Sequence, residues 1–241
     1  MNRRTFLKAV PAAAALSAGA SRSKRAAAAS SGAAGGLEPI ALPKPAKDGG
    51  KSVLAALWER RTTREISSEK LPLEVLSNLL WAAWGVNREK GPFGQIGRTA
   101  ASASNSQEID LYVALPEGVY LYDAVGHALA PVVAKDVRSM CGNRGRRAGV
   151  DAPVRLIFVA NIARYSKAGF QEPGLHDPEI QKSYYNVATG LIAGNVYLFA
   201  ASQGLAAWFH NCDKAGLAEA LKLGPDERVL YAETVGYPAS R

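Results

Sequence analysis

The sequence is poor in the residues that bind metals and carry nucleophilic catalysis. It has three histidines and two cysteines in 241 residues, and no two histidines stand at the helical spacing of a zinc site. His210, Cys212 and Asp213 could supply ligands, but no partner motif completes a tight site around them. We therefore expect no bound metal.

Common catalytic signatures are also missing. The chain has no G-x-S-x-G elbow, no G-x-G-x-x-G fingerprint and no P-loop. These absences exclude a serine hydrolase of the α/β type, a Rossmann dinucleotide domain and a common nucleotide hydrolase. A cysteine–histidine nucleophile stays open, although nothing in the sequence orients one.

No apolar run is long enough for a permanent membrane-spanning helix. The run 9–20 is short and rich in small residues, and it follows Arg3-Arg4-Thr5-Phe6-Leu7-Lys8. A receptor reads such an arginine pair and exports folded cargo. We predict a twin-arginine signal at 1–20 and a periplasmic or otherwise exported protein without stable membrane insertion. An ordinary secretory signal or an uncleaved anchor is the alternative.

Two further parts follow the signal. Residues 21–50 are mostly Ala, Ser, Gly, Pro and Lys, a composition that predicts a flexible linker. Residues 51–241 then have the length of one domain with a substantial core.

The net charge of +8 does not by itself indicate nucleic acid. The densest basic cluster holds Arg144, Arg146 and Arg147 among glycines and without an aromatic residue, which favours a solvated loop over a site for nucleic acid or another polyanion. Cys141 and Cys212 could pair in an oxidising compartment, but their separation in the sequence does not fix their geometry.

Periodicity predicts an α+β domain. Helical spacing of apolar residues indicates helices at 51–60 and from Pro72 to Gly85, and alternating or continuous apolar runs indicate strands. The expected strands are 109–115, 119–122, 128–133, 154–161 and 228–235. Residues 87–106 hold little that would form a core, so we expect a long loop that carries a site.

The longest helix is expected at 177–203. It is apolar nearly all round, and small residues such as Gly190 and Gly194 would let another helix approach closely. The pattern fits a helix in the core of one chain and a helix at a homodimer interface equally well.

Two polar clusters suggest a mononucleotide. Arg60, Arg61, Thr62, Thr63 and Arg64 follow the first helix, and alternate side chains of an extended segment can converge on one phosphate. The second cluster, 98–107, offers short amides and hydroxyls for the edge of a planar heterocycle, with alanines that leave room for a ring. A solvated charged turn is the alternative for the first cluster.

At this point the chain resembles the FMN-dependent nitroreductase family. The resemblance rests on R-R-T-T-R at 60–64, L-L-W-A-A-W-G-V-N-R at 79–88, R-T-A-A-S-A-S-N-S-Q-E at 98–108, G-N-V-Y-L-F-A-A-S-Q-G-L-A at 194–206 and T-V-G-Y-P at 234–238. It covers essentially everything from residue 51 onward.

The resemblance implies a nitroreductase-like α+β fold: a central, mostly antiparallel sheet surrounded by helices, in an intertwined homodimer with FMN at the subunit interface. It further implies a cofactor site whose residues fall into three groups. Phosphate and ribityl contacts map onto Arg60, Arg61, Thr62 and Arg64, ring-edge contacts onto Ser102, Asn105 and Gln107, and flavin-lining positions onto Ala206, Ala207, Trp208 and Phe209.

The implied activity is a ping-pong oxidoreduction of a small organic molecule such as a nitroaromatic or a quinone, or a dehydrogenation. The flavin carries the redox step, so no dedicated catalytic side chain is required. A non-catalytic flavin-holding protein is the alternative. Trp84, Trp208 and Phe209 could stack on a substrate, but core packing is favoured for them. An exported enzyme would need an electron donor other than free NAD(P)H.

Overall fold

The computed structural model describes residues 36–142 and 151–239. The predicted signal, the first half of the predicted linker and the arginines at 144–147 lie outside the described residues. No helix in the described ranges has the length and hydropathy needed to cross a bilayer.

The core of the fold is one antiparallel sheet of seven strands in the order β1-β6-β5-β4-β7-β9-β8. The bounds in that order are Ile40–Ala41, Ala128–Val133, Gly118–Asp123, Ile109–Leu115, Val154–Asn161, Glu227–Gly236 and Ala206–His210. The central strands β4 and β7 are buried along almost their whole length, because helices cover both faces of the sheet.

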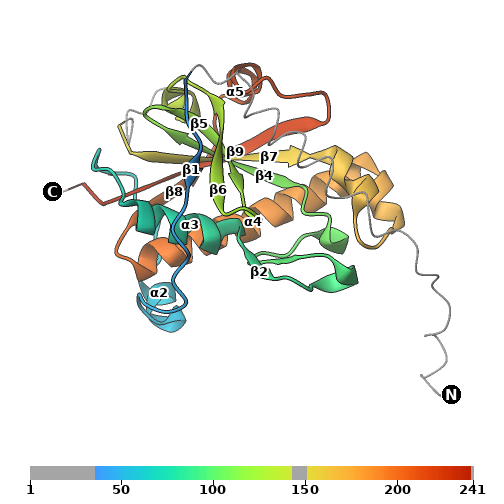
Figure 1. Cartoon of the computed structure of the whole chain (residues 1–241), viewed down its shortest axis with the longest axis horizontal. Helices are drawn as coiled ribbons and strands as arrows, with labels where there is room; N and C mark the ends of the chain where they lie inside the picture. Colours follow the sequence, from blue (N-terminus) through green and yellow to red (C-terminus); the bar gives the residue numbers. More distant parts are fainter. Residues whose placement is uncertain (1–35, 143–150, 240–241) are drawn as a thin grey trace.

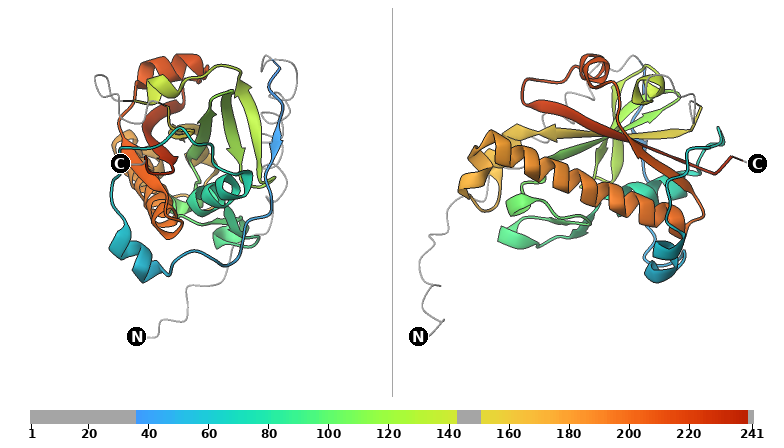
Figure 2. Two further views of the ribbon diagram at one scale, coloured as in Figure 1. Left: turned by 90° about the vertical axis from the view of Figure 1, so that its left-hand side faces the viewer. Right: turned by 180° about the vertical axis from the view of Figure 1, so that it is seen from behind.

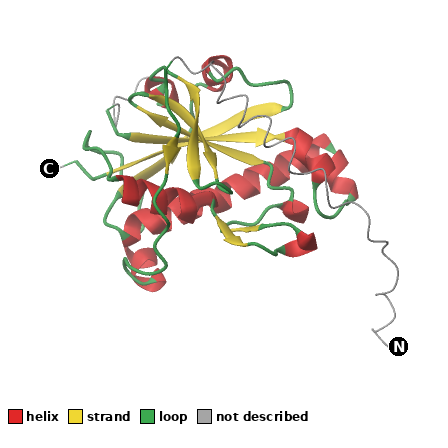
Figure 3. Cartoon of the chain, in the orientation of Figure 1, coloured by secondary structure: helices red, strands yellow, loops and turns green. Residues whose placement is uncertain are grey.

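Helices form a layer on each side of this sheet (Figure 1, Figure 3). On one side α3 (Leu73–Trp84) and the 25-residue α4 (Pro178–Ser202) pack against the main apolar cluster, with α2 (Val53–Glu59) beside α4. On the other side α5 (Lys214–Ala220) and the 3-10 turn η3 (Arg138–Cys141) cover a smaller cluster. Figure 2 shows α4 running along the sheet from behind.

The α+β fold class predicted from the sequence is confirmed. Every predicted helix and strand is present, and most boundaries agree within two residues. The predicted long loop at 87–106 instead contains a small hairpin, β2 (Val86–Arg88) with β3 (Gly97–Arg98), and the 3-10 turns η1 (Pro92–Gly94) and η2 (Ala103–Asn105).

Part of the predicted linker at 21–50 was assigned wrongly. Ile40 and Ala41 pair with β6, and Leu42 is buried in the main cluster. Hydrogen bonds also hold this segment: the Ser77 hydroxyl donates to the Pro43 carbonyl at 2.6 Å, and the Ala46 N–H donates to the Asn78 side chain at 2.8 Å. Its composition is otherwise typical of a tether. Strand β8 and helix α5, together with the 3-10 turns η4 (Ile162–Lys167) and η5 (Pro173–His176), were not predicted.

Glu233 is an ionisable side chain in the middle of the main core. It lies on β9 opposite Leu156 and Phe209, it is 0 % exposed, and neither carboxylate oxygen has a hydrogen-bond partner. Burial raises the pKa of Glu233 well above its usual value. The folded chain therefore holds this side chain in its protonated form.

This burial predicts a pH-dependent destabilisation. In the unfolded chain Glu233 ionises near pH ~4.3, so stability falls as the pH rises above that value towards the raised folded pKa. Glu233→Gln changes the Tm by one amount at pH 8 and by another at pH 4. We expect the change at pH 8 to be more favourable to the variant by roughly 3–10 °C. The exposed Glu117→Gln should show no such difference. Thermal melts across this pH range test it, and a Glu233→Gln effect that is equal at both pH values would contradict it.

Candidate functional site

The arginine segment 60–64 runs exposed along the end of α2 and is anchored to the sheet at one point. The Thr63 N–H donates to the Ala207 carbonyl of β8, with an N···O distance of 3.0 Å. The side chains of Arg60, Arg61 and Arg64 are exposed. The segment thus presents three guanidinium groups on a backbone that the sheet holds in place.

Tyr197 on α4 connects this segment to β8. Its hydroxyl lies 3.0 Å from the Thr62 hydroxyl and accepts the Phe209 N–H at 2.9 Å. The Arg60 guanidinium lies 5.5 Å from the centre of the Tyr197 ring. Sequence analysis missed Tyr197, because a tyrosine inside an apolar helix is usually a core residue.

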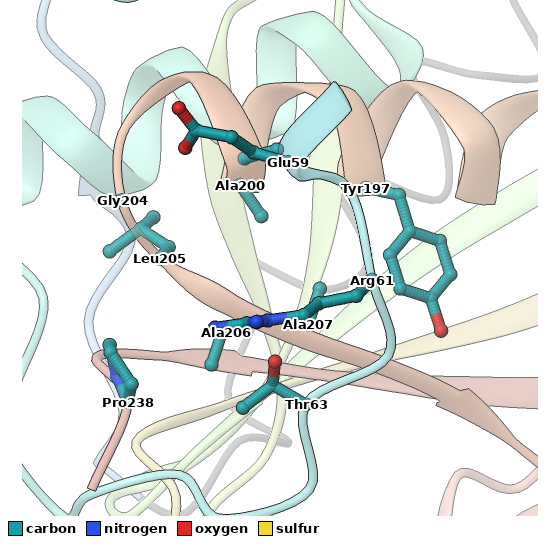
Figure 4. Close-up of a pocket in the computed structure, with 11 residues that line it drawn as sticks. Glu59, Arg61, Thr63, Tyr197, Ala200, Gly204, Leu205, Ala206, Ala207 and Pro238 are labelled. Carbon is teal, nitrogen blue, oxygen red and sulfur yellow. The ribbon is translucent and has the colours of Figure 1, made fainter. Parts of the chain in front are cut away.

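A pocket of about 140 Å³ opens beside the arginine segment (Figure 4). Arg61 and Thr63 line it together with Ala206 and Ala207 of β8 and the end of α4. Gly204 adopts a left-handed φ of 69° there, which lets the chain turn from α4 directly into β8. Glu59 also lines the pocket. Ligand pockets usually have volumes of roughly 300–1,000 Å³, so this one has room for a group the size of a phosphate and not for a whole mononucleotide.

Side chains of the segment 60–64 alternate in direction as predicted, but they do not all point to one place. Arg60 and Thr62 contact Tyr197, whereas Arg61 and Thr63 line the pocket. Arg64 lies farther along, with its guanidinium 5.6 Å from the centre of the Trp208 ring. The chemistry of this donor set, guanidinium with hydroxyl, is that of a phosphate site.

The second cluster forms a loop that is closed by its own side chains. Gln107 receives a hydrogen bond from Arg98 at 2.8 Å and donates to the Ile96 carbonyl at 2.9 Å and to Asn105 at 3.2 Å. Asn105 also donates to the Ile96 carbonyl, at 3.1 Å, and the Ser102 hydroxyl accepts the Gln107 N–H at 3.0 Å. These bonds give the loop a fixed shape.

Gln107 supports the shape of the loop. Gln107 is 5 % exposed, and both ends of its amide bind protein atoms. Its amide oxygen keeps a second lone pair, and the ring-edge role of Gln107 stays a prediction. Ser102 and Asn105 are half-buried, and their ring-edge role stays a prediction.

The loop also holds three residues other than glycine in the left-handed region. Ser104, Asn105 and Gln107 have φ values of 48°, 54° and 51°. Such a conformation is unfavourable for most residues and often occurs where a site needs a particular backbone shape. Behind the loop, burial raises the pKa of Glu108, although the Ser106 hydroxyl donates to this carboxylate at 2.6 Å.

The aromatic residues considered for substrate stacking belong to the core. Trp84 is 2 % exposed and donates to the Ile109 carbonyl at 2.9 Å. Trp208 is 5 % exposed, and Phe209 is half-buried against Phe158. The alternative favoured from the sequence, core packing, is therefore confirmed for Trp84 and Trp208.

A different aromatic pair is exposed. Phe93 and Phe170 stack with ring centres 5.7 Å apart and planes inclined by 20°, and they are 56 % and 53 % exposed. The backbone N–H of Gly169, next to Phe170, donates to the Ser104 carbonyl at 3.2 Å. The pair therefore lies beside the loop 98–107. No periodic pattern predicts this pair, because the two residues come from separate loops.

Helix α4 separates the two clusters. Tyr197 contacts the arginine segment, and Asn195 donates to the Thr99 carbonyl of the loop at 3.3 Å. Side chains two residues apart on an α-helix point in directions about 200° apart around its axis. The arginine segment and the loop 98–107 therefore lie against opposite flanks of α4 in one chain.

Between these flanks α4 presents an apolar face to the solvent. Val187 and Leu191 are 59 % and 46 % exposed, and a Cβ added at Gly190 or Gly194 would meet nothing within 4 Å. Beside it, α2 exposes Leu54, Leu57 and Trp58, the last to 91 %. Contiguous apolar surface of this kind is typical of an interface between proteins.

Comparisons with known proteins agree with this architecture. The model of the nitroreductase family matches residues 57–237. A Methanocaldococcus jannaschii protein that bears the name nitroreductase is 32 % identical over 165 residues, which cover 62 % of this chain and 73 % of that one.

Solved structures give the same result. A nitroreductase homologue from Ralstonia eutropha superposes with a TM-score of 0.74 at 39 % identity, covering 87 % of this chain and 93 % of the other. One from Anabaena variabilis has a TM-score of 0.63 at 19 % identity, covering 84 % of this chain but 42 % of its own, and shows the fold alone. The family match spans most of the domain, including both polar clusters and the whole of α4, and the chain therefore belongs to the nitroreductase family.

Proposed function

We propose that this protein is an FMN-dependent oxidoreductase that acts on a small organic substrate such as a nitroaromatic or a quinone. The observation that supports this most strongly is the exposed arginine segment, from which Arg61 and Thr63 line a small pocket while Arg60 and Arg64 are exposed on either side of them. FMN, when bound, supplies the redox chemistry. The chain supplies a phosphate clamp and a shaped loop.

The proposed cofactor site is completed by a second copy of the chain. The two clusters lie on opposite flanks of α4, so one mononucleotide cannot contact both within one protomer. If the exposed apolar faces of α4 and its symmetry mate pack together, the loop 98–107 of each chain comes beside the arginine segment of the other. Membership of the family supports a homodimer of this kind.

Within this site the residues have separate tasks. Arg60, Arg61 and Arg64 with Thr62 hold the phosphate and ribityl groups, and Ser102 and Asn105 face the edge of the ring. Ala206 and Ala207 line the cavity closely and leave room for the ligand. The exposed pair Phe93 and Phe170 provides a flat apolar surface next to the loop, suited to a planar substrate. Donor and acceptor bind in turn, which gives ping-pong kinetics.

The predicted signal at 1–20 supports a further proposal, that the mature protein works outside the cytoplasm with an electron donor other than free NAD(P)H. Export in the folded state would carry FMN along, because the cofactor is acquired before transport. Cell fractionation tests this proposal. Mature protein found only in the cytoplasm would refute both the export and the inference about the donor.

Turnover is tested on protein purified with its cofactor. We expect a flavin absorbance spectrum, loss of that spectrum on reduction with dithionite, and its return when a nitroaromatic or a quinone is added. Steady-state rates at varied donor and acceptor should give the parallel lines of a ping-pong mechanism. A reduced flavin that none of these acceptors reoxidises faster than buffer does would favour a protein that holds flavin without turnover.

The phosphate clamp is tested by mutation. Arg60→Ala combined with Arg64→Ala should lower FMN affinity by roughly 100-fold or more, because each lost charge-assisted bond contributes about 1.5–3 kcal/mol. A matched control removes two exposed charges beyond the opposite face of the sheet, with Lys135→Gln and Lys222→Gln. Isothermal titration of the apoproteins with FMN measures the effect. Full flavin occupancy in the arginine variant would rule out the clamp.

A further inference from the structure

The two cysteines, which the proposed function does not use, meet where three elements join. Cys141 ends η3, and Cys212 stands between the end of β8 and the start of α5. The backbone N–H of Asp213 donates to the Met140 carbonyl, with an N···O distance of 2.9 Å. Asp213 also caps α5, since its side chain accepts the Gly216 N–H at 3.1 Å.

This backbone hydrogen bond joins two peptide groups that each have a cysteine at one end. The carbonyl belongs to the peptide group between Met140 and Cys141, and the N–H belongs to the one between Cys212 and Asp213. Each cysteine is thus the next residue along its chain from the same hydrogen bond, and the two lie on neighbouring segments. Disulfides form at α-carbon separations of roughly 4.4–6.8 Å. A small adjustment of the turn and the loop is enough to reach this range.

The side chains share one environment as well. Cys141 is 0 % exposed inside the apolar cluster between the sheet and α5, and Cys212 is half-buried against the same cluster. Burial is the main cause that raises the pKa of Cys141 to about 12, and interaction with Cys212 adds to it.

We propose that Cys141 and Cys212 form an intramolecular disulfide when the chain meets a disulfide oxidant of the glutathione class. The Cys212 thiolate, the more exposed sulfur, attacks one sulfur of the oxidant, whose S–S bond breaks and releases one thiol. Cys141 then loses its proton and displaces the second thiol from Cys212, forming the new S–S bond. The oxidant gains two electrons and two protons and leaves as two thiols. Both cysteines are free, and hence reduced, in this structure.

The crosslink would restrain the C-terminal end of β8. It closes a loop of about 70 residues that includes β7 and α4, and such long loops gain the most from closure. It would also tie η3 to the start of α5, next to His210. The two alanines at the other end of β8 line the proposed phosphate pocket, so oxidation would stiffen the strand that supports it.

The test uses the whole protein, reduced and then exposed to oxidised glutathione at pH 8. One sample is treated in the folded state, and a second is unfolded in urea and refolded in the same mixture so that burial cannot block the reaction. Both are then denatured, alkylated and analysed by mass spectrometry of the intact chain and of its peptides. Thermal melts of the oxidised and the reduced protein accompany them.

We expect the refolded sample to lose two hydrogens, resist alkylation and yield a crosslinked peptide pair that contains Cys141 and Cys212. The oxidised protein should melt higher than the reduced one, by on the order of 10 °C. Cys212→Ser should abolish the difference, and Cys141→Ala should leave Cys212 joined to glutathione. Two alkylated thiols after refolding, a glutathione adduct in the unsubstituted chain, or a crosslink between chains would each overturn the proposal.

Discussion

Helix α4 constrains the position of every part of the candidate site. Its inner face packs on the sheet, Tyr197 on one flank contacts the arginine segment, and Asn195 on the other flank contacts the loop 98–107. Helical geometry fixes the angle between these flanks, so no local rearrangement can bring the two clusters together within one chain. The exposed outer face, with Val187 and Leu191, is the surface on which a second chain would remove this separation.

The sequence predicted the elements whose patterns are local. Strand 109–115 and helix 177–203 carry long apolar patterns, so their type and limits follow from periodicity alone. Strand β8 escaped prediction because its five residues, A-A-W-F-H, show no alternation and are buried by contacts with distant segments. Strand β1 was not predicted either, because a strand of two residues paired with β6 is too short to show a pattern in the sequence.

The candidate site was predictable in its chemistry and not in its arrangement. Arginines and hydroxyls close together in sequence predict a phosphate site, and the structure places them on one exposed segment beside a pocket. The hydrogen bonds of the Gln107 side chain could not be predicted from the sequence. They depend on Arg98 and on the Ile96 carbonyl, which the β2–β3 hairpin places beside Gln107. Phe93 and Phe170 meet only through tertiary contacts.

The central claim, a cofactor site shared by two chains, is tested most directly by mixing two defective variants. One carries Arg60→Ala with Arg64→Ala, and the other carries Ala101→Trp, which fills the exposed alanine position of the loop without touching its internal hydrogen bonds. Neither variant alone should retain FMN. A dimer with one chain of each kind has one intact composite site, so its purification should recover one FMN per two chains. Failure of the mixed dimer to bind FMN, with both variants folded, would contradict a shared site.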